Sequence, residues 1–426
     1  MADIVSIASD DTLKELIQQR FQHEPAWMRE RRLTAAEAYF ALDWPKLSRT
    51  PLKKRKLDQI PVFNAPPGSN HAAPVFRATD GEVKIHLVNN QVVALSVPSA
   101  LTDRGLVLKP LAESLGEAPV QEHLGRIIPD SDDKVTALTA ALWQNGVYLH
   151  VPAGLRETVQ VSIESEASQQ LPALLTRNLI VCERGTHVII TERLRSEDGA
   201  DKMLLSEHTE IVVGAGAKVQ YGAIQQCSSR VEGFIHRAGQ IAQDGTLEWN
   251  IGEFGAGLVV SDHVSHLNEP GALTKSVTVF FGSGQQHQDY TAKSYHHAPH
   301  TTSDMVARGV MKDRSRSVFT GLTQIEKGAK GTDGRQREQT LMLSDEARAD
   351  AIPSLLIDER DVYAAHAASA GPVDRAALFY LTSRGLTEEE AERMIVHGFL
   401  APVIDSIPVQ ELRSEVWDAV ERKIRE

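Results

Sequence analysis

Cysteine is scarce in this chain of 426 residues. Only Cys182 and Cys227 occur, and they do not form a Cys-x-x-Cys pair. The sequence therefore encodes neither a disulfide framework nor a self-sufficient zinc or iron–sulfur site. We expect both residues to be buried thiols.

Long apolar runs and an excess of basic residues are also absent. No run reaches the roughly 18 to 20 residues that a membrane span needs, and the first residues show no basic region ahead of an apolar stretch. We expect a cytoplasmic protein that does not enter a membrane. The formal net charge of -12 argues against a nucleic-acid surface, because neutralising phosphates requires clustered Lys and Arg.

Several familiar motifs of nucleotide-binding and hydrolytic proteins are missing. The chain contains no Gly-x-x-x-x-Gly-Lys-Ser/Thr loop, no Gly-x-Ser-x-Gly elbow and no His-Glu-x-x-His pair. Residues 213–216 read Val-Gly-Ala-Gly after a strand-like run, but a strand pattern continues where a dinucleotide site requires a helix. Any nucleotide hydrolysis therefore has to come from another chain.

What the sequence does contain is a long β pattern with a regular period. From residue 145 to about residue 334, short runs of alternating β-branched and polar residues are separated by turns with glycine. Turn glycines recur at nearly constant intervals, at Gly154, Gly185, Gly216, Gly245 and Gly271. A period near 30 indicates stacked coils that cannot bury an apolar face alone. We predict a mainly β fold, a β-helix or stacked β-solenoid, because a β-sandwich would show much more closely spaced turns and no longer period.

Helical patterns flank the β region. On the N-terminal side we predict helices at 11–21 and about 27–42, then a surface loop over 47–74 with a solvated basic run at 53–56. A strand pair at 85–88 and 92–97 and a helix near 133–143 follow. On the C-terminal side we predict helices at 374–383, 387–399 and 409–425, the second with a Thr-Glu capping box. The expected regions are an N-terminal helical region and connector (1–75), a β-helix core (76–366) and a C-terminal helical domain (367–426). That domain either caps the solenoid or docks a partner, and capping is the simpler interpretation.

His366 stands where the β pattern gives way to the helical one. We predict that it lies in a turn between the last strand and the first C-terminal helix, among alanines too small to cover an imidazole. Its ring could then reach a metal or a partner surface, although a lone histidine in such a turn is often a hydrogen-bonded spacer.

A second group of histidines comprises His287, His296, His297 and His300, together with Asp289. Neighbouring strand positions point to opposite faces, so His296 and His297 cannot both bind one ion from a strand. No carboxylate that would orient the ligands is evident from the sequence. We favour a hydrogen-bonded ladder over a metal site, and the alternative, a stand-alone histidine metalloprotein, predicts stoichiometric metal on the purified chain.

An ordered set of motifs resembles the SufB/SufD family of iron–sulfur cluster assembly proteins. The resemblance covers nearly the whole chain and is most evident at 299–303, 308–313, 317–321, 332–333 and 355–385. The chain length and the Glu-Pro-Ala-Trp segment at 24–27 are more similar to SufD members than to SufB members. The resemblance implies a right-handed parallel β-helix with helical ends, assembled with a SufB-like chain and a SufC-like ABC-type ATPase.

The resemblance also implies a site. The family's functional histidine lies in a segment of the form Asp-Asp-Val-x-x-Ser-His-Gly-Ala, and the segment 360–368 keeps it as His366. The first Asp, the Ser and the Gly are replaced here by Arg360, Ala365 and Ala367. His366 would offer an imidazole nitrogen to iron where a transient iron–sulfur cluster forms against the SufB-like partner. The essential cysteine of SufB has no counterpart in this chain, so no cluster is expected to be bound stably by the chain alone.

By the same resemblance, the SufC-like ATPase would dock on the C-terminal helices around Leu378, Phe379, Tyr380 and Arg384, and ATP-driven closure would pull on both scaffold chains. The implied function is a non-enzymatic scaffold subunit of the SUF system. A homodimer in the absence of SufB, and a part in flavin or sulfur transfer, remain open. The alternative is a polysaccharide-active β-helix enzyme, which would need aromatic residues and paired carboxylates along its groove. The aromatic content is 5%, and no paired-acid motif is evident.

Overall fold

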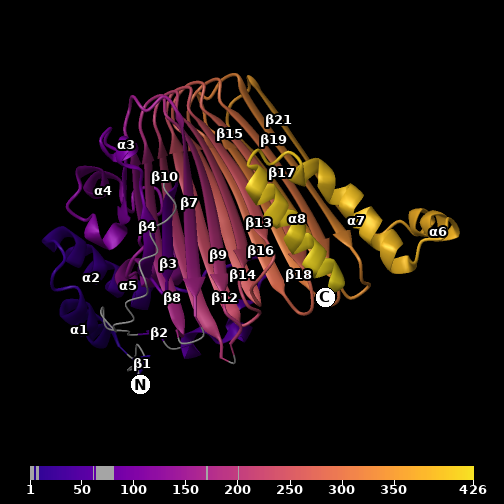
Figure 1. Cartoon of the computed structure of the whole chain (residues 1–426), viewed down its shortest axis with the longest axis horizontal. Helices are drawn as coiled ribbons and strands as arrows, with labels where there is room; N and C mark the ends of the chain where they lie inside the picture. The colour runs from indigo at the N-terminus through magenta and orange to yellow at the C-terminus, as the bar shows by residue number, and fades with distance from the viewer. Residues whose placement is uncertain (1–3, 6–8, 61, 64–80, 169–170, 200) are drawn as a thin grey trace.

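The computed structural model describes the chain except for residues 1–3, 6–8, 61, 64–80, 169–170 and 200. Most of the described residues form a parallel β-solenoid of about 8 turns, with helices towards both ends of the chain (Figure 1). The mainly β solenoid predicted from the glycine period is thus confirmed.

Each coil of the solenoid contributes one strand to each of two sheets, which we call the even sheet and the odd sheet. In spatial order the even sheet contains β20 (Arg348–Ile357), β18 (Arg316–Ile325), β16 (His287–His296), β14 (Leu258–Leu267), β12 (Val231–Ile241), β10 (Met203–Val213), β8 (Ala173–Cys182), β6 (Val147–Val151) and β5 (Val107–Pro110). The odd sheet contains β21 (Val362–Pro372), β19 (Thr332–Met342), β17 (Thr302–Met311), β15 (Leu273–Gly282), β13 (Thr246–Glu253), β11 (Lys218–Gln226), β9 (His187–Ser196), β7 (Thr158–Ala167), β3 (Val83–Val88) and β4 (Gln91–Ser96). The coil strands are parallel, whereas the pairs β3–β4 and β5–β6 are antiparallel.

The strand register explains the sequence period. Two residues that pair on neighbouring coils are separated in the sequence by the length of one coil. Glu232 pairs with Leu258 in one of the shortest coils, and Arg316 pairs with Arg348 in one of the longest, so coil length varies little along the solenoid. Gly185 and Gly216 occupy corners of the coil with φ of 71° and 64°. A residue with a Cβ atom is disfavoured in this left-handed region, so the corners need glycine.

The space between the two sheets changes character along the solenoid. In the first coils the inward side chains are aliphatic and buried, for example Ile163, Ile190 and Ile211. From the middle coils onward the buried inward side chains include many polar ones, among them Glu192, Glu207, Arg237, Glu253, Ser261, His263, Gln288, His296, Ser303, Thr323, Gln336 and Glu338. Towards the C-terminal end the interior is therefore mixed, with polar side chains beside apolar ones such as Phe280, Met305 and Phe319.

The N-terminal helices lie against the outer face of the even sheet, and the best-packed are α1 (Asp10–Arg20), α2 (Ala26–Ala41) and α5 (Lys134–Leu142). Helix α1 begins after Ser9, whose hydroxyl accepts a hydrogen bond from the Thr12 amide. Asp133 caps α5 in a capping box with Thr136. The shorter elements of this half are β1 (Ile4–Val5), β2 (Val62–Phe63), α3 (Ser99–Thr102), α4 (Ala118–His123), η1 (Leu52–Arg55), η2 (Leu57–Gln59) and η3 (Leu111–Glu113).

The connector after α2 is held to the solenoid more tightly than predicted. Thr50 is buried and its hydroxyl lies 2.8 Å from His287 Nε2. Within the basic run, Arg55 approaches Glu232 at 3.6 Å, while Lys53 and Lys54 are exposed as expected. The later part of the predicted loop and the predicted boundary at residue 75 lie outside the described residues.

The C-terminal helices are α6 (Arg375–Ser383), α7 (Glu388–Ile404) and α8 (Gln410–Arg425). The capping box of Thr387 and Glu390 forms as predicted. Helix α7 runs past the predicted end at residue 399 and includes Pro402, because its last turns bury Val403 and Ile404 against the odd sheet and α8. Burial of an apolar face there outweighs the local cost of a proline.

The interpretation of this domain as a cap was wrong. Helices α7 and α8 lie along the outer face of the odd sheet rather than over the end of the solenoid (Figure 1). Leu412 of α8 is fully buried and occupies the space over Gly222, where a Cβ atom would overlap its side chain. The apolar stripe of α8 thus covers a face of the sheet and leaves the end uncovered. Within the described residues, no helix is long and apolar enough to cross a membrane.

Candidate functional site

The C-terminal end of the solenoid is formed by two edge strands. Among the described residues, β20 pairs only with β18 and β21 pairs only with β19. The side chains of Leu356, Ile357 and Tyr363 at this end are 52%, 42% and 57% exposed. We call this region the open end, because no further coil covers the two strands.

His366 lies in the middle of β21. It pairs in register with Gln336 of β19. The side chain of Gln336 donates to Thr323 Oγ1 of the even sheet at 2.6 Å, so it points between the sheets. His366 shares that face of the odd sheet, and its side chain is exposed because the solenoid ends there. In the described part of the chain, no hydrogen bond or ion pair engages the ring.

The predicted turn around His366 was therefore wrong, and so was the boundary of the β core at residue 366. The strand passes through His366 and ends at Pro372. Its alanine-rich sequence has a weak intrinsic preference for strand, which pairing with β19 overrides. Ala365 and Ala367 point to the opposite face of β21, so the neighbours of the ring on its own face of this strand are Ala364 and Ala368.

Two further polar side chains lie on the inward face of the odd sheet next to His366. They were not among the residues predicted from the sequence. Gln336 and Glu338 are both about 5% exposed. Thr340 Oγ1 donates to Glu338 Oε1, whereas Glu338 Oε2 and Gln336 Oε1 are buried without a hydrogen-bond partner in the structure. Burial raises the pKa of Glu338. The alternation of Thr332, Gln336, Glu338 and Thr340 at even positions could have indicated a shared face.

A separate cluster lies deeper in the solenoid, and we call Arg237, Glu192, Glu207 and Glu253 the buried charge cluster. Arg237 Nη2 lies 3.1 Å from Glu192 Oε2 and 3.8 Å from Glu207 Oε1, and Nη1 lies 3.6 Å from Glu253 Oε1. The Tyr221 hydroxyl donates to Glu192 Oε2 at 2.6 Å. Burial and the nearby Glu192 raise the pKa of Glu207 well above its usual range. One cation thus faces three carboxylates, and burial favours the protonated form of Glu207, the carboxyl least compensated by Arg237.

Three histidines of the second group, His287, His296 and His297, form separate polar contacts. His296 is buried between Thr301 Oγ1 at 2.8 Å and Ser303 Oγ at 2.9 Å. His297 Nδ1 lies 3.0 Å from Glu326 Oε1, so the expectation that no carboxylate accompanies these residues was wrong. Glu326 directly follows β18, the strand next to β16, so the sequence around His297 cannot reveal this carboxylate. Across the described residues there is no group of three or more His, Cys, Asp or Glu side chains arranged to hold a metal ion.

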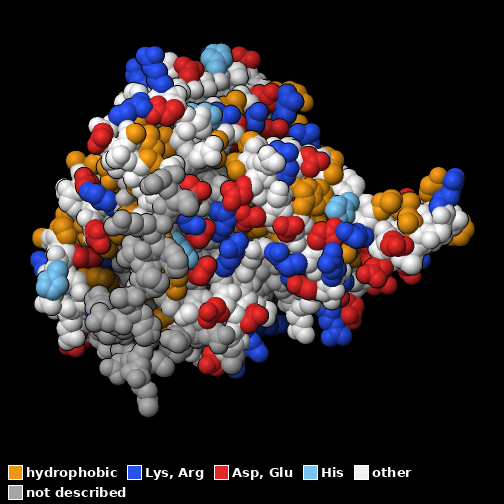
Figure 2. Space-filling model, in the orientation of Figure 1, with side chains coloured by type: hydrophobic (Ala, Val, Ile, Leu, Met, Phe, Trp, Pro, Cys, Tyr) orange, Lys and Arg blue, Asp and Glu red, His pale blue; other side chains and the backbone are white. Residues whose placement is uncertain are grey.

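Of the predicted docking residues, Leu378, Phe379 and Tyr380 lie on α6 and Arg384 is its C-cap. No residue of α6 is buried, and Phe379 and Tyr380 are 75% and 57% exposed. Leu378 is half-buried, and the Arg384 guanidinium lies 5.1 Å from the Tyr380 ring centroid. The helix projects beyond the solenoid (Figure 1), and hydrophobic side chains are visible on this projection (Figure 2).

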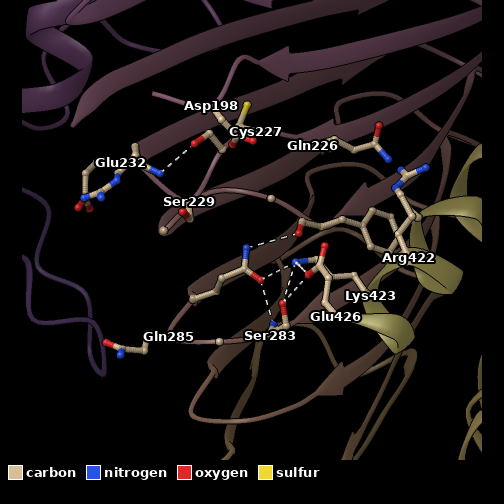
Figure 3. A pocket seen from close by; sticks show the side chains of 18 of the residues that line it. Asp198, Gln226, Cys227, Ser229, Glu232, Ser283, Gln285, Arg422, Lys423 and Glu426 are labelled. Atoms are coloured by element: carbon tan, nitrogen blue, oxygen red, sulfur yellow. Dashed lines mark hydrogen bonds and ion pairs between the residues drawn. The ribbon is translucent and has the colours of Figure 1, made fainter. Parts of the chain in front are cut away.

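A polar pocket of about 810 Å³ lies between coil corners and the C-terminal end of α8. Lys423 Nζ contacts Ser283 Oγ at 2.9 Å and Gln286 Oε1 at 3.1 Å, which fixes the end of α8 to a corner (Figure 3). Cys227 lines the opposite side, and burial raises the pKa of its thiol, as it does for Cys182. Both cysteines are buried as predicted, and neither belongs to the open end.

Comparison with known proteins shows which family the chain is related to. The family model described as "SUF system FeS cluster assembly, SufBD core domain" matches residues 163–399. The chain belongs to the SufBD family. It is 31% identical to the iron–sulfur cluster assembly protein SufD of Bacillus subtilis, over 94% of this chain and 95% of that protein. It is 26% identical to SufB of the same organism, over 93% and 90% of the two chains. A SufBD family protein of Staphylococcus epidermidis is also 26% identical, over 92% and 88%. The predicted membership, with greater likeness to SufD than to SufB, is confirmed.

Proposed function

We propose that this chain is a non-catalytic scaffold subunit of the SUF iron–sulfur cluster assembly complex and pairs with a SufB-like chain through the open end. The observation that carries the proposal is the pair of long edge strands β20 and β21. Each has one edge without a neighbouring strand among the described residues, and His366 lies on the inward face of β21. Unpaired strand edges present free N–H and C=O groups that another chain can use. Strand β21 has no proline before Pro372, whereas β20 is interrupted by Pro353, so β21 is the better pairing edge.

In this role His366 offers a neutral imidazole nitrogen to iron of the nascent cluster, which is the cargo of the complex. Imidazole nitrogen is a suitable ligand for iron, but cluster sulfur and iron are held mainly by thiolates. Cys182 and Cys227 are buried elsewhere in the solenoid, and burial raises the pKa of both thiols. The thiolate ligand therefore has to come from the SufB-like chain, and the chain alone is proposed to hold no cluster stably.

The exposed face of α6 is the proposed docking surface of a SufC-like ATPase. Exposed aromatic side chains on an otherwise unburied helix are typical anchors of protein interfaces, and Phe379 and Tyr380 provide two of them. ATP-driven approach of two ATPase subunits would pull on both scaffold chains and open the interface near His366. We place this work in the cytoplasm, where thiols are kept reduced.

The buried charge cluster gives no support to the alternative of a polysaccharide-active enzyme. Glu192 and Glu253 are fully buried in the buried charge cluster, and a glycan cannot reach them. When no SufB-like chain is present, the open end would instead pair with a second copy of this chain.

The first experiment is co-expression with the neighbouring SufB- and SufC-like chains, followed by mass measurement of the purified assembly. We expect a stable complex that contains one copy of this chain. A chain that purifies alone and has no affinity for either partner would contradict the proposal.

The second experiment replaces His366 with alanine in that complex. We expect cluster assembly to be lost while the mass of the complex stays unchanged, because the imidazole binds iron and does not hold the strands together. His23→Ala is the matched control, since His23 is an exposed histidine of the N-terminal region. Normal cluster assembly by the His366→Ala complex would refute the metal role.

The third experiment addresses α6. The double change Phe379→Ala and Tyr380→Ala is expected to weaken ATPase binding by roughly tenfold or more, because truncating an aromatic anchor costs above about 1 kcal/mol. Met394→Ala on α7 is the control, as Met394 is also exposed. Equal ATPase affinity of the double variant and the control would rule out this surface.

A further inference from the structure

Glu338 occupies an unusual position at the open end. It lies on β19, two residues after Gln336, which pairs with His366. Residues two apart on a strand point to the same face, so Glu338 and His366 are diagonal neighbours on the inward side of the odd sheet. The strand spacing and rise put their Cα atoms roughly 8 Å apart, within the combined reach of the two side chains.

The carboxyl group of Glu338 is incompletely satisfied. Thr340 Oγ1 donates to Oε1, but Oε2 is buried and has no partner among the described residues. The residue of β21 that pairs with Glu338 is Ala368, which has no polar side-chain atom. A buried carboxylate oxygen without a donor or cation is costly, so the site favours a ligand that supplies positive charge.

No cation of the described chain fills this role. The arginines of β19, Arg335 and Arg337, stand at alternate positions and are exposed on the outer face, where they pair with Asp333 and Asp304. Among the described residues, the neighbours of Glu338 on the inward face of the odd sheet include no Lys or Arg; they are His366, Gln336, Thr340, Met305 and Ala307. The unpartnered oxygen therefore shares its surroundings with the imidazole at the open end.

We propose that Glu338 is a second iron ligand, which acts beside His366 when the open end is closed by the SufB-like chain. This inference rests on the proposed function. Carboxylate oxygen and imidazole nitrogen are both established donors for iron, and Glu338 binds as the carboxylate. Two ligands from this chain make an incomplete site, which agrees with the absence of any larger metal-binding group in the described residues. The remaining ligands, including thiolate, come from the partner.

The test measures iron binding rather than cluster yield. The complex with the SufB-like chain is titrated with Fe(II) under anaerobic conditions, and the iron neighbours are counted by X-ray absorption. Glu338→Gln keeps the size of the side chain and removes its charge, and we expect at least ~10-fold weaker binding and the loss of one oxygen or nitrogen neighbour. Glu346→Gln is the matched control, because Glu346 lies in the exposed turn between β19 and β20 and pairs with Arg314.

Two further variants separate the possible outcomes. Glu338→Cys is expected to replace one oxygen neighbour of iron by sulfur, which a purely structural role of Glu338 would not produce. His366→Ala is measured in parallel. If Glu338→Gln binds iron as the control does while His366→Ala does not, Glu338 is no ligand and the proposed function stands. If His366→Ala also binds as the control does, the metal role of the open end is wrong as well. Should Glu338→Gln fail to assemble, the Glu338→Cys spectrum decides, and a spectrum without an added sulfur neighbour overturns the proposal.

Discussion

Replacement of Arg237 by leucine tests how much of the protein's stability depends on the single cation of the buried charge cluster. Arg237 is 1% exposed and lies within 4 Å of Glu192, Glu207 and Glu253. Removal of the guanidinium leaves Glu192 and Glu253 without a cation in a fully buried site. Breaking a buried ion pair from one side costs about 3–5 kcal/mol, so we expect a loss of that size in the free energy of unfolding near neutral pH.

The loss should also depend on pH. In the variant the stranded carboxyls have higher pKa values in the folded than in the unfolded state, so the folded protein binds more protons and its stability falls as the pH rises. Urea unfolding followed by circular dichroism at pH 5.5 and pH 7.5 measures both effects. Arg335→Leu is the control, because Arg335 forms an exposed pair with Asp333 that contributes about 1 kcal/mol or less. A loss below about 1 kcal/mol, or one that is equal at both pH values, would refute the reasoning.

Three further predictions follow from burial. Because the pKa of Glu207 is raised in the folded state, the contribution of this group to stability falls as the pH rises, and Glu207→Gln should gain stability relative to the wild type between pH 5 and pH 8; a constant difference in urea unfolding would contradict this. Leu412→Ala should destabilise the docking of α8 by about 2–5 kcal/mol, measured as faster amide exchange in α8, and unchanged protection would disprove it. Since burial raises the pKa of both thiols, Cys182 and Cys227 should react with a thiol reagent at pH 8 only after unfolding, and labelling of the native chain would count against this.

The coils could be predicted from the sequence because their signal is local and repeated. Gly185 and Gly216 mark corners that only glycine fits easily, and the runs between them alternate with the strand period. Helix starts were equally accessible where a cap is encoded, as at Asp133 and Thr387.

The errors arose where distant segments decide the structure. The strand around His366 depends on pairing with β19, since its alanines have little preference for a strand. The position of α8 depends on Gly222, far earlier in the chain, which makes room for Leu412. The face shared by Glu338 and His366 follows from strand register, and no short motif records it.

The two ends of the solenoid differ in their capacity to accept another chain. At the open end β20 and β21 contain 10 and 11 residues, whereas at the opposite end β4 and β5 contain 6 and 4 residues. Short edge strands resist the addition of a further strand, and long ones permit it. A solenoid that can add strands at only one end, its receptive end, can pair there with one other chain. No second edge is then left for further end-to-end assembly. If the open end pairs as proposed, end-to-end association stops at two chains, and the fibres that a solenoid with two receptive ends would form are avoided.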